Sequence, residues 1–386
     1  MSSAPPSYRA VSPQDTLERV APYLEAMGIT RTADITGLDS IGIPVYTTVR
    51  PNAWMLQVSS GKGFTHLASK CSSVMEAVEF FHSETPREDF LFPASENYLL
   101  ETSRIRLVSP RQLGQDISPL YHSDALIDWL VAEDLSSGDP LWLPSDACYF
   151  TKRGFIPANT NGLASGNTVE EASLHALYEL IERDAYAAIV QSGRVRFRNL
   201  ATRVDPGSVP FPFIASMLER VFAQDCSCFL FLLPSKADVY TFWCGVGQLD
   251  HHVTPDAFNS GLGCHADPSV ALSRAITEAV QSRLVFIHGS REDIYPKISS
   301  KFSRNQINPK VFIDYLSSIP SKHWSSVAVS PQPPLFDSGL VFSSLLTQLE
   351  AADLLPLYRV DMTLPEFDIP VVKIIAPRLS LNTKIV

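Results

Sequence analysis

Apolar residues recur every three to four positions in three long stretches of the chain, a period that predicts amphipathic helices. The clearest stretch, residues 168–190, places Leu174 and Leu177 on one side and acidic residues on the other. The stretches 66–83 and 268–288 follow the same pattern. Further helices are predicted at residues 13–27, 123–132, 212–224 and 309–317.

Short apolar runs between Gly, Pro and Ser residues predict strands. They lie at residues 43–49, 54–60, 104–110, 229–235, 239–248 and 368–377. Residues 290–335 are rich in Ser, Pro and Lys and predict a surface excursion. No internal repeat or low-complexity tract is apparent. Helices interspersed with short strand pairs predict an α/β (α+β) fold.

The helix predicted at 168–190 carries an acidic face. Glu171, Glu179 and Glu182 lie within roughly 80° of one another at 3.6 residues per turn, and His175 falls in the same arc. Carboxylates grouped in this way repel one another unless water or cations neutralise them. A solvated polar face explains the pattern as well as a cation site does. Glu171 also has a local explanation, because Thr168 and Glu171 fit a capping box.

A second predicted helix, 66–83, has the same design. Ser72, Glu76 and Glu79 lie on one face within roughly 60°. A strand-like run and a lysine between two glycines, Lys62, precede this helix, which is compatible with a phosphate cradle. The glycine spacing departs from that of a P-loop, so a tight turn with an exposed lysine is an equal alternative.

The third predicted helix begins at Asp267, an N-cap acid followed by proline. Arg274, Glu278 and Gln281 share one face of this helix, whereas Arg283 points well away from them. For Gln281 and Arg283 to serve one site, the helix must be distorted or the site must wrap around it.

These three segments, taken together, resemble the YcaO superfamily. The resemblance rests on NxNGLAxGNTxEEAxxxALxELIERDA, on the upstream Ser-x-x-x-Glu-x-x-Glu and on the downstream AxxRAxTEAxQSRLxxIxGxRED, and it covers roughly residues 30–375. It implies an ATP- and Mg²⁺-dependent enzyme that phosphorylates a backbone amide oxygen of a peptide. It also implies mainly antiparallel sheets with helices lining a central nucleotide cleft. The expected division is an N-terminal helical segment, 1–28, and a single catalytic domain, 29–386.

The resemblance also implies roles for individual residues. The expected Mg²⁺ ligands are Glu76, Glu79, Glu179 and Glu182. The expected ATP contacts are Ser72, Lys62, Asn167, Glu171, Gln281 and Arg283. Glu182 and Arg283 are the expected catalytic residues. One position departs from the family pattern, because His175 stands where glutamine is frequent, and its protonation would change the local charge.

Composition narrows the setting. A net charge of −10 argues against a nucleic-acid-binding protein, and 45% hydrophobic residues in a chain of 386 support a sizeable core. The chain shows neither a signal peptide nor an apolar stretch long enough for a membrane span. Six scattered cysteines without paired zinc-site spacing are expected to be reduced, so a cytoplasmic location is expected.

The sequence favours one reaction within the resemblance. The sequence ends soon after Pro377 without the Pro-x-Pro-x-Pro tail that is frequent in azoline-forming members, and a fused leader-binding domain is not expected. Its opening resembles members paired with TfuA-type proteins. Backbone thioamidation with a sulfide donor is therefore the leading hypothesis, followed by azoline formation, a non-catalytic ATP-binding accessory and a different ATP-dependent ligase or kinase. The expected partners are a precursor peptide and a separate TfuA-like or leader-binding protein, and a homodimer is left open.

Overall fold

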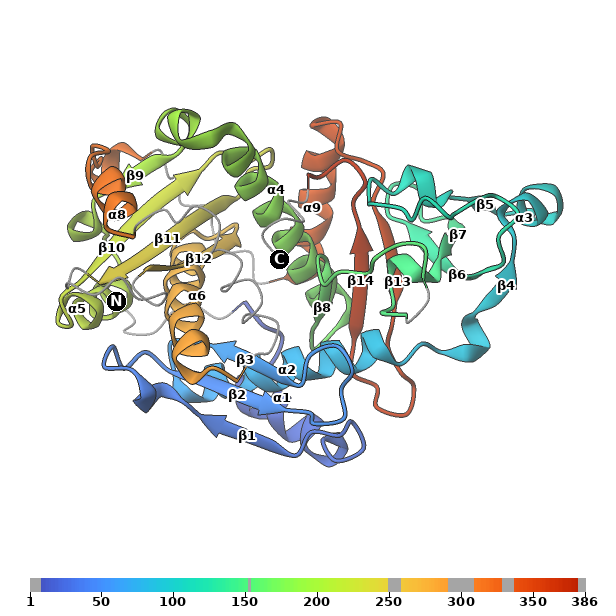
Figure 1. Cartoon of the computed structure of the whole chain (residues 1–386), viewed down its shortest axis with the longest axis horizontal. Helices are drawn as coiled ribbons and strands as arrows, with labels where there is room; N and C mark the ends of the chain where they lie inside the picture. The colour runs from blue at the N-terminus through green and yellow to red at the C-terminus, as the bar shows by residue number, and fades with distance from the viewer. Residues whose placement is uncertain (1–7, 152–153, 249–257, 291–308, 328–336, 381–386) are drawn as a thin grey trace.

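The computed structural model describes residues 8–151, 154–248, 258–290, 309–327 and 337–380. Within these residues the strands form three sheets, and helices α2, α4 and α6 lie between them (Figure 1). The sheets are antiparallel except where β5 pairs with β7. The predicted mixed fold with mainly antiparallel sheets and helices in the centre is therefore confirmed.

The N-terminal sheet has the order β1-β2-β3. Its strands are β1 (Arg31–Asp34), β2 (Val45–Val49) and β3 (Val58–Lys62). Helix α2 (His66–Glu84) packs on β2 and β3, and α1 (Pro13–Val20) packs on α2 through Val20. The helix expected at 13–27 is shorter than predicted, because a 3₁₀ turn follows Val20 and Gly28 adopts φ +71°.

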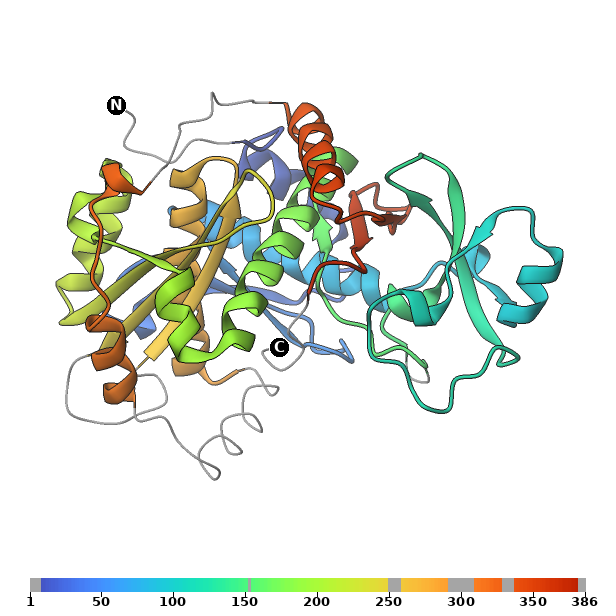
Figure 2. The same cartoon turned by 90° about the horizontal axis from the view of Figure 1, so that it is seen from above.

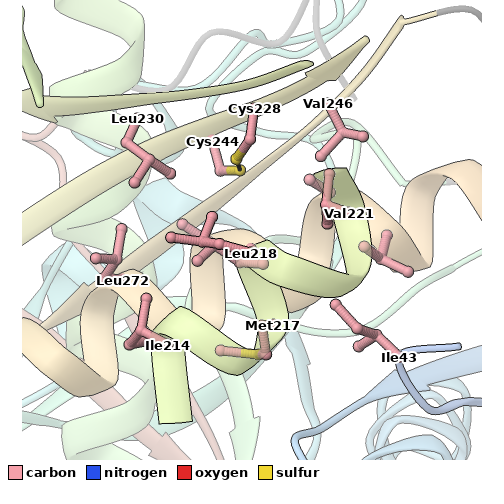
Figure 3. Close-up of a cluster of buried hydrophobic side chains, with 14 of the residues drawn as sticks. Ile43, Ile214, Met217, Leu218, Val221, Cys228, Leu230, Cys244, Val246 and Leu272 are labelled. Atoms are coloured by element: carbon pink, nitrogen blue, oxygen red, sulfur yellow. Dashed lines mark hydrogen bonds between the residues drawn. The ribbon is translucent and has the colours of Figure 1, made fainter. Parts of the chain in front are cut away.

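A second sheet has the order β12-β11-β10-β9. It comprises β9 (Thr202–Val204), β10 (Cys226–Leu233), β11 (Tyr240–Gln248) and β12 (Phe258–His265). Helices α5 (Pro212–Phe222) and α6 (Pro268–His288) cover one face of this sheet. Figure 3 shows Leu218 and Val221 of α5 beside Cys228 and Cys244, whose sulfur atoms are 3.6 Å apart in this core. All six cysteines are free thiols.

The third sheet has the order β5-β7-β6-β13-β14-β8, with β4 added beside β6. Its strands are β4 (Phe92–Ala94), β5 (Arg106–Leu107), β6 (Ile127–Asp134), β7 (Pro140–Pro144), β8 (Leu163–Ser165), β13 (Tyr358–Asp361) and β14 (Val371–Ile375). Helix α4 (Val169–Leu200) packs on β14, and α9 (Ser338–Ala351) packs on α4. Helix α3 (Glu96–Thr102) lies at the far end of this sheet (Figure 2).

The helix predicted at 123–132 is wrong. Residues 127–134 form β6, which pairs with β4, β7 and β13. Pairing on both sides buries Trp129 completely and Leu130 almost completely, on opposite faces of the strand. Tertiary packing therefore decides this segment, as is common where strand propensity is modest.

The remaining predictions hold to different extents. The helices predicted near α2, α4, α5 and α6 form, and β10, β11 and β14 match predicted strands. Within the predicted excursion at 290–335, residues 291–308 and 328–335 lie outside the described ones. Its described helix, α8 (Pro309–Ser317), buries Ile313 and Leu316 in the core, so this part is not a surface excursion. Within the described residues, no helix combines the length and apolar character that crossing a bilayer needs.

Candidate functional site

Three edge strands, one from each sheet, lead into the three helices that carry the predicted site residues. Strands β3, β8 and β12 each stand at the end of their sheet, and each precedes its helix, α2, α4 and α6. Glycine lets each helix approach closely, because a Cβ at Gly61 would lie 2.0 Å from the Ser73 amide nitrogen and one at Gly261 would lie 2.3 Å from that of Ala279. A Cβ at Gly166 would lie 2.5 Å from the Ala172 amide nitrogen.

The three helices present their polar residues at the same distances from their N-caps, which are Thr65, Thr168 and Asp267. Seven residues after these caps stand Ser72, His175 and Arg274. Eleven residues after them stand Glu76, Glu179 and Glu278. Fourteen residues after them stand Glu79, Glu182 and Gln281. This repeat is hard to recognise in the sequence because most positions between these residues are unlike in the three helices.

Carboxylates from these helices bind the free backbone amides of the edge strands. The Ser60 amide of β3 donates to Glu76 at 2.8 Å, and the Leu262 amide of β12 donates to Glu278 at 3.1 Å. Glu79 of α2 reaches across to the third sheet, where it accepts from the Ser165 amide at 2.8 Å and from its hydroxyl at 2.7 Å. Edge strands of all three sheets thus donate backbone hydrogen bonds to carboxylates of this group.

Burial disfavours the charged form of several of these carboxylates and so raises their pKa values. Burial, aided by the charges of Glu76 and Glu179, raises the pKa of Glu79 to about 7 against two opposing hydrogen bonds from Ser165. Burial, together with Glu278, also raises the pKa of Glu182 to about 7. Burial raises the pKa of Glu179, although Arg183 lowers it. Carboxylates held in this way gain from any cation that enters between them.

Positive groups from three elements lie beside the carboxylates: Lys62 of β3, Arg183 of α4 and Arg274 of α6. Lys62 of β3 forms an ion pair with Glu278. Burial disfavours ionisation of Glu278, but Lys62 and Arg183 outweigh it and leave the pKa of Glu278 lowered. The Nε atoms of Arg183 and Arg274 are buried without a hydrogen-bond partner among the described residues. Unsatisfied guanidinium donors beside carboxylates suit an anionic ligand such as a phosphate.

His175 links α4 to α6. Its Nε2 lies 2.9 Å from Arg274 Nη2, and its Nδ1 lies 3.4 Å from Arg9 Nη2. Burial and these two guanidinium groups hold the pKa of His175 well below its usual range. The imidazole is therefore neutral near pH 7, and the departure from the family pattern adds no charge to the site.

The described part of the N-terminal segment covers Asn167 and Glu171. The Thr16 hydroxyl donates to Asn167 Oδ1 at 2.9 Å. Glu171 accepts from Arg9 at 2.8 Å and from the Ala10 amide at 2.9 Å. Burial raises the pKa of Glu171, but Arg9 and the Ala10 amide outweigh it, so the net pKa is lowered.

The capping box expected for α4 is half present. Thr168 caps the helix by accepting from the Glu171 amide. The Glu171 carboxylate binds Arg9, Ala10 and Asn167, which lie toward the N-terminal segment. The division into residues 1–28 and 29–386 stays a prediction, and contacts of Arg9 and Thr16 join its two parts.

The structure brings most of the predicted site residues together. Ser72 accepts from the Lys62 amide at 3.4 Å, and Gln281 donates to the Ser60 carbonyl at 2.6 Å. Arg283 lies elsewhere, since its guanidinium pairs with Asp39 at 2.9 Å and donates to Gln248 at 3.2 Å. The arginine that α6 turns toward the carboxylates is Arg274, and the predicted role of Arg283 stays a prediction.

Several residues at this site received no role from the sequence. The equal cap-to-carboxylate spacing is the signal that identifies Arg274 and Glu278. No sequence signal marks Arg9 or Thr16, because their positions depend on the packing of α1. Among the described residues, no three acidic, His or Cys side chains are already grouped closely enough to hold one metal ion. The carboxylates fit cations that take their remaining ligands from water or phosphate.

Comparison with known proteins identifies the family. Residues 60–380 match the family model described as the ATP- and Mg²⁺-binding YcaO cyclodehydratase. This chain belongs to the YcaO family.

Curated relatives carry no stated activity. An uncharacterized protein of Mycobacterium tuberculosis is 36% identical over 77% of this chain and 66% of its own length. An uncharacterized protein in the tfuA 3′ region of Rhizobium leguminosarum bv. trifolii is 34% identical over 77% of this chain and 71% of its own length. One from Methanothermobacter thermautotrophicus is 30% identical over 97% and 95%. The chain spans just under two thirds of the mycobacterial relative.

Solved structures share the fold. YcaO from Methanopyrus kandleri, bound with AMPPCP and Mg²⁺, aligns with a TM-score of 0.73 and 22% identity over 96% of this chain and 92% of its own. A heterocyclase in complex with substrate and cofactor aligns with a TM-score of 0.76 and 21% identity over 97% of this chain and 53% of its own. The microcin synthetase McbBCD complex of E. coli, with pro-MccB17 bound, gives a TM-score of 0.63 and 15% identity over 90% and 87%.

Proposed function

We propose that this chain uses ATP and Mg²⁺ to phosphorylate a backbone amide oxygen of a ribosomally made peptide, and that sulfide then converts this amide to a thioamide. The observation that carries the proposal is a group of carboxylates beside positively charged groups whose hydrogen-bond donors are not all satisfied. The carboxylates lie on α2 and α4, where Glu182 is buried and Glu76, Glu79 and Glu179 are half-buried. Two guanidinium groups with unsatisfied donors, Arg183 of α4 and Arg274 of α6, lie beside them. A nucleoside triphosphate bound with Mg²⁺ needs carboxylates for the cation and positive groups for the phosphates, close together.

The carboxylate wall is proposed to hold the cations. Its four members are Glu76, Glu79, Glu179 and Glu182. Bound Mg²⁺ supplies charge neutralisation and orientation of the phosphates. Glu79 and Glu182 must release their protons to take part, which pKa values of about 7 allow near neutral pH.

The cationic wall is proposed to bind the phosphates. Arg274 and Arg183 each have a buried Nε without a hydrogen-bond partner among the described residues, and Lys62 pairs with Glu278. The charges of all three act on Glu182. Guanidinium groups offset the charge that develops during phosphoryl transfer. Ser72, Asn167, Glu171, Gln281 and Arg283 keep the nucleotide-contact roles that the resemblance implies, as proposals.

The reaction balances with ATP and sulfide as co-reactants. The amide oxygen forms a bond to the γ-phosphorus, the bond from that phosphorus to the bridging oxygen breaks, and ADP leaves. Sulfide then attacks the activated amide carbon, and inorganic phosphate departs with the former amide oxygen. The protein needs no nucleophile of its own, and its contribution is orientation and charge stabilisation.

Azoline formation is the second candidate, with a side chain of the substrate in place of sulfide. The description of the family as a cyclodehydratase and the fold shared with a substrate-bound heterocyclase favour it. The gene neighbourhood of the Rhizobium relative favours thioamidation with a TfuA-like partner, because the resemblance links such partners to sulfide chemistry. A precursor peptide and this partner are proposed as the interacting molecules.

A reconstitution assay tests the proposal. Protein, Mg-ATP, sulfide, a precursor peptide encoded beside the gene and the TfuA-like partner are combined, and phosphate release and peptide mass are followed. Exchange of one oxygen for sulfur supports thioamidation, whereas loss of one water identifies azoline formation. ATP turnover without a change in the peptide, in every combination, would contradict both reactions.

A further inference from the structure

Lys373 is a buried lysine that the proposed site does not use directly. It stands in the middle of β14, a strand in which every residue is buried, and its side chain is 1% exposed. Burying an ammonium group is costly unless it is paired or hydrogen-bonded. Its neighbours on the same face, Val371 and Ile375, belong to an apolar cluster, so apolar packing does not account for a lysine here.

The ammonium group of Lys373 fastens the loop that enters the site. It donates to the Asn159 carbonyl at 2.5 Å. Three residues further along, Gly162 adopts φ +75° and its carbonyl accepts from the Ile374 amide at 2.8 Å. Lys373 also faces Leu163 in the register between β14 and β8. The loop at 159–162 is thus held to β14 at two successive residues.

This loop determines where Glu79 finds its partner. Strand β8 follows the loop directly and ends at Ser165, whose amide and hydroxyl both donate to Glu79. A shift of the loop would move both donors away from that carboxylate. Lys373 therefore acts on Glu79 through the backbone of β8.

Lys373 can also influence Glu179 through its charge, because α4, which carries Glu179, packs on β14. It lies near enough to lower the pKa of Glu179, after Arg183. Burial lowers the pKa of Lys373 itself to about 8, while Cys148 and Glu179 raise it. The backbone contacts of Lys373 thus concern Glu79 on α2, and its charge concerns Glu179 on α4.

We propose that Lys373 is a positioning residue that sets Glu79 and Glu179 in place for cation binding, through the 159–165 backbone and through its positive charge. The inference rests on the proposed function, because it concerns the same cations. Groups that orient metal ligands from behind typically change metal affinity by about ten- to a hundredfold when they are removed.

The test is a titration of Mg²⁺ against the protein in the presence of AMPPCP, with the heat of binding as readout. We expect Lys373→Met to weaken the apparent Mg²⁺ affinity by about tenfold or more and Lys373→Arg to restore most of it. Ile375→Ala, on the same face of β14, should lower Tm while keeping wild-type Mg²⁺ affinity. If Lys373→Met does not fold, Lys373→Gln is the second variant. It keeps a donor for Asn159 but removes the positive charge, so it should still weaken Mg²⁺ binding.

The outcomes separate the two proposals. Wild-type protein that binds no AMPPCP at any Mg²⁺ concentration would overturn the proposed function. Wild-type binding that Lys373→Met matches, or that Ile375→Ala weakens equally, would overturn the role of Lys373 alone. Wild-type affinity in Lys373→Gln would also overturn it if that variant is the one that folds.

Discussion

Helix α6 shares the spacing of α2 and α4 but not their charge. At the three equivalent positions α2 and α4 present four carboxylates in total, whereas α6 presents Arg274, Glu278 and Gln281. Its one carboxylate is already neutralised by Lys62. One scaffold therefore gives two cation walls, the carboxylates of α2 and those of α4. It also gives one anion wall, which consists of Arg274 of α6 together with Arg183 of α4 and Lys62 of β3. The contrast between α6 and the other two helices is what makes the site fit a metal-bound triphosphate.

The largest expected effect comes from removing a charge from the cation walls. Glu182→Gln and Glu76→Gln should each lower ATP turnover by about a hundredfold or more, because charge stabilisation of this kind contributes several kcal/mol. The fold should persist, since a neutral amide removes repulsion among buried carboxylates. Phosphate release measures turnover, and Tm measures stability.

Glu170→Gln is the matched control for this effect. Glu170 is exposed on the same helix, α4, and points away from the cluster. It should turn over ATP like the wild type. Normal turnover in both Glu182→Gln and Glu76→Gln would contradict the proposal that the carboxylates of α2 and α4 bind the cations.

The anion wall gives the next largest effect, and it distinguishes two arginines. Arg274→Met should lower turnover by about ten- to a hundredfold, because a guanidinium group beside the phosphates is lost. Arg283→Met should instead lower stability by about 3 kcal/mol, since it leaves Asp39 buried without its partner. Phosphate release and denaturant unfolding of both variants provide the measurement.

The opposite ranking would be informative. A folded Arg283→Met protein without turnover, beside an active Arg274→Met protein, would show that the phosphates lie at Arg283. The nucleotide role that the family resemblance implies for Arg283 would then hold.

The pH dependence of Mg²⁺ binding tests the cation walls, because two of their carboxylates titrate near neutral pH. The pKa values of Glu79 and Glu182, about 7, lie above the ordinary value of 4.5. Mg²⁺ binds the deprotonated forms, so its apparent affinity should rise as pH increases through about 7, by about tenfold per carboxylate for each pKa unit below that value. Without cations, stability should fall as pH rises from about 4.5 to 7, because the folded state retains protons that the unfolded chain releases.

Glu79→Gln provides the control for the pH profile. It removes one of the two titrating carboxylates, so the rise in Mg²⁺ affinity should be shallower than in the wild type. Calorimetric titrations at several pH values give the slope. A wild-type affinity that does not change between pH 6 and pH 8, roughly one unit on each side of these pKa values, would contradict the electrostatic description.

The smallest expected effect concerns Lys62. Its charge is already engaged by Glu278, so only a small part of it is left for a phosphate. Lys62→Met should therefore raise the KM for ATP by roughly two- to fivefold. Lys70→Met changes an exposed lysine on α2 and should leave KM unchanged. Equal KM values for the two variants would exclude Lys62 from the anion wall.

The sequence predicts the helices that carry the acidic residues of α2 and α4, for a physical reason. Thr65, Thr168 and Asp267 cap their helices, and a cap fixes which later residues share a face. The acidic pattern of α2 and α4 could therefore be read without knowing the fold.

Other parts depend on packing between distant segments. Strand β6 was predicted as a helix because its apolar residues do not reveal that it pairs with three other strands. The contacts of Arg9 with Glu171 and of Lys373 with Asn159 join residues more than 150 positions apart. Nothing local in the sequence marks such pairs.

One measurement tests the contrast between the walls most directly: calorimetric titration of AMPPCP, with and without Mg²⁺, into the wild type, Glu182→Gln and Arg274→Met. We expect wild-type binding to depend on Mg²⁺, Glu182→Gln to lose this dependence, and Arg274→Met to bind more weakly while keeping it. Wild-type binding that Mg²⁺ does not change, or variants that both bind like the wild type, would contradict a site with two cation walls and one anion wall.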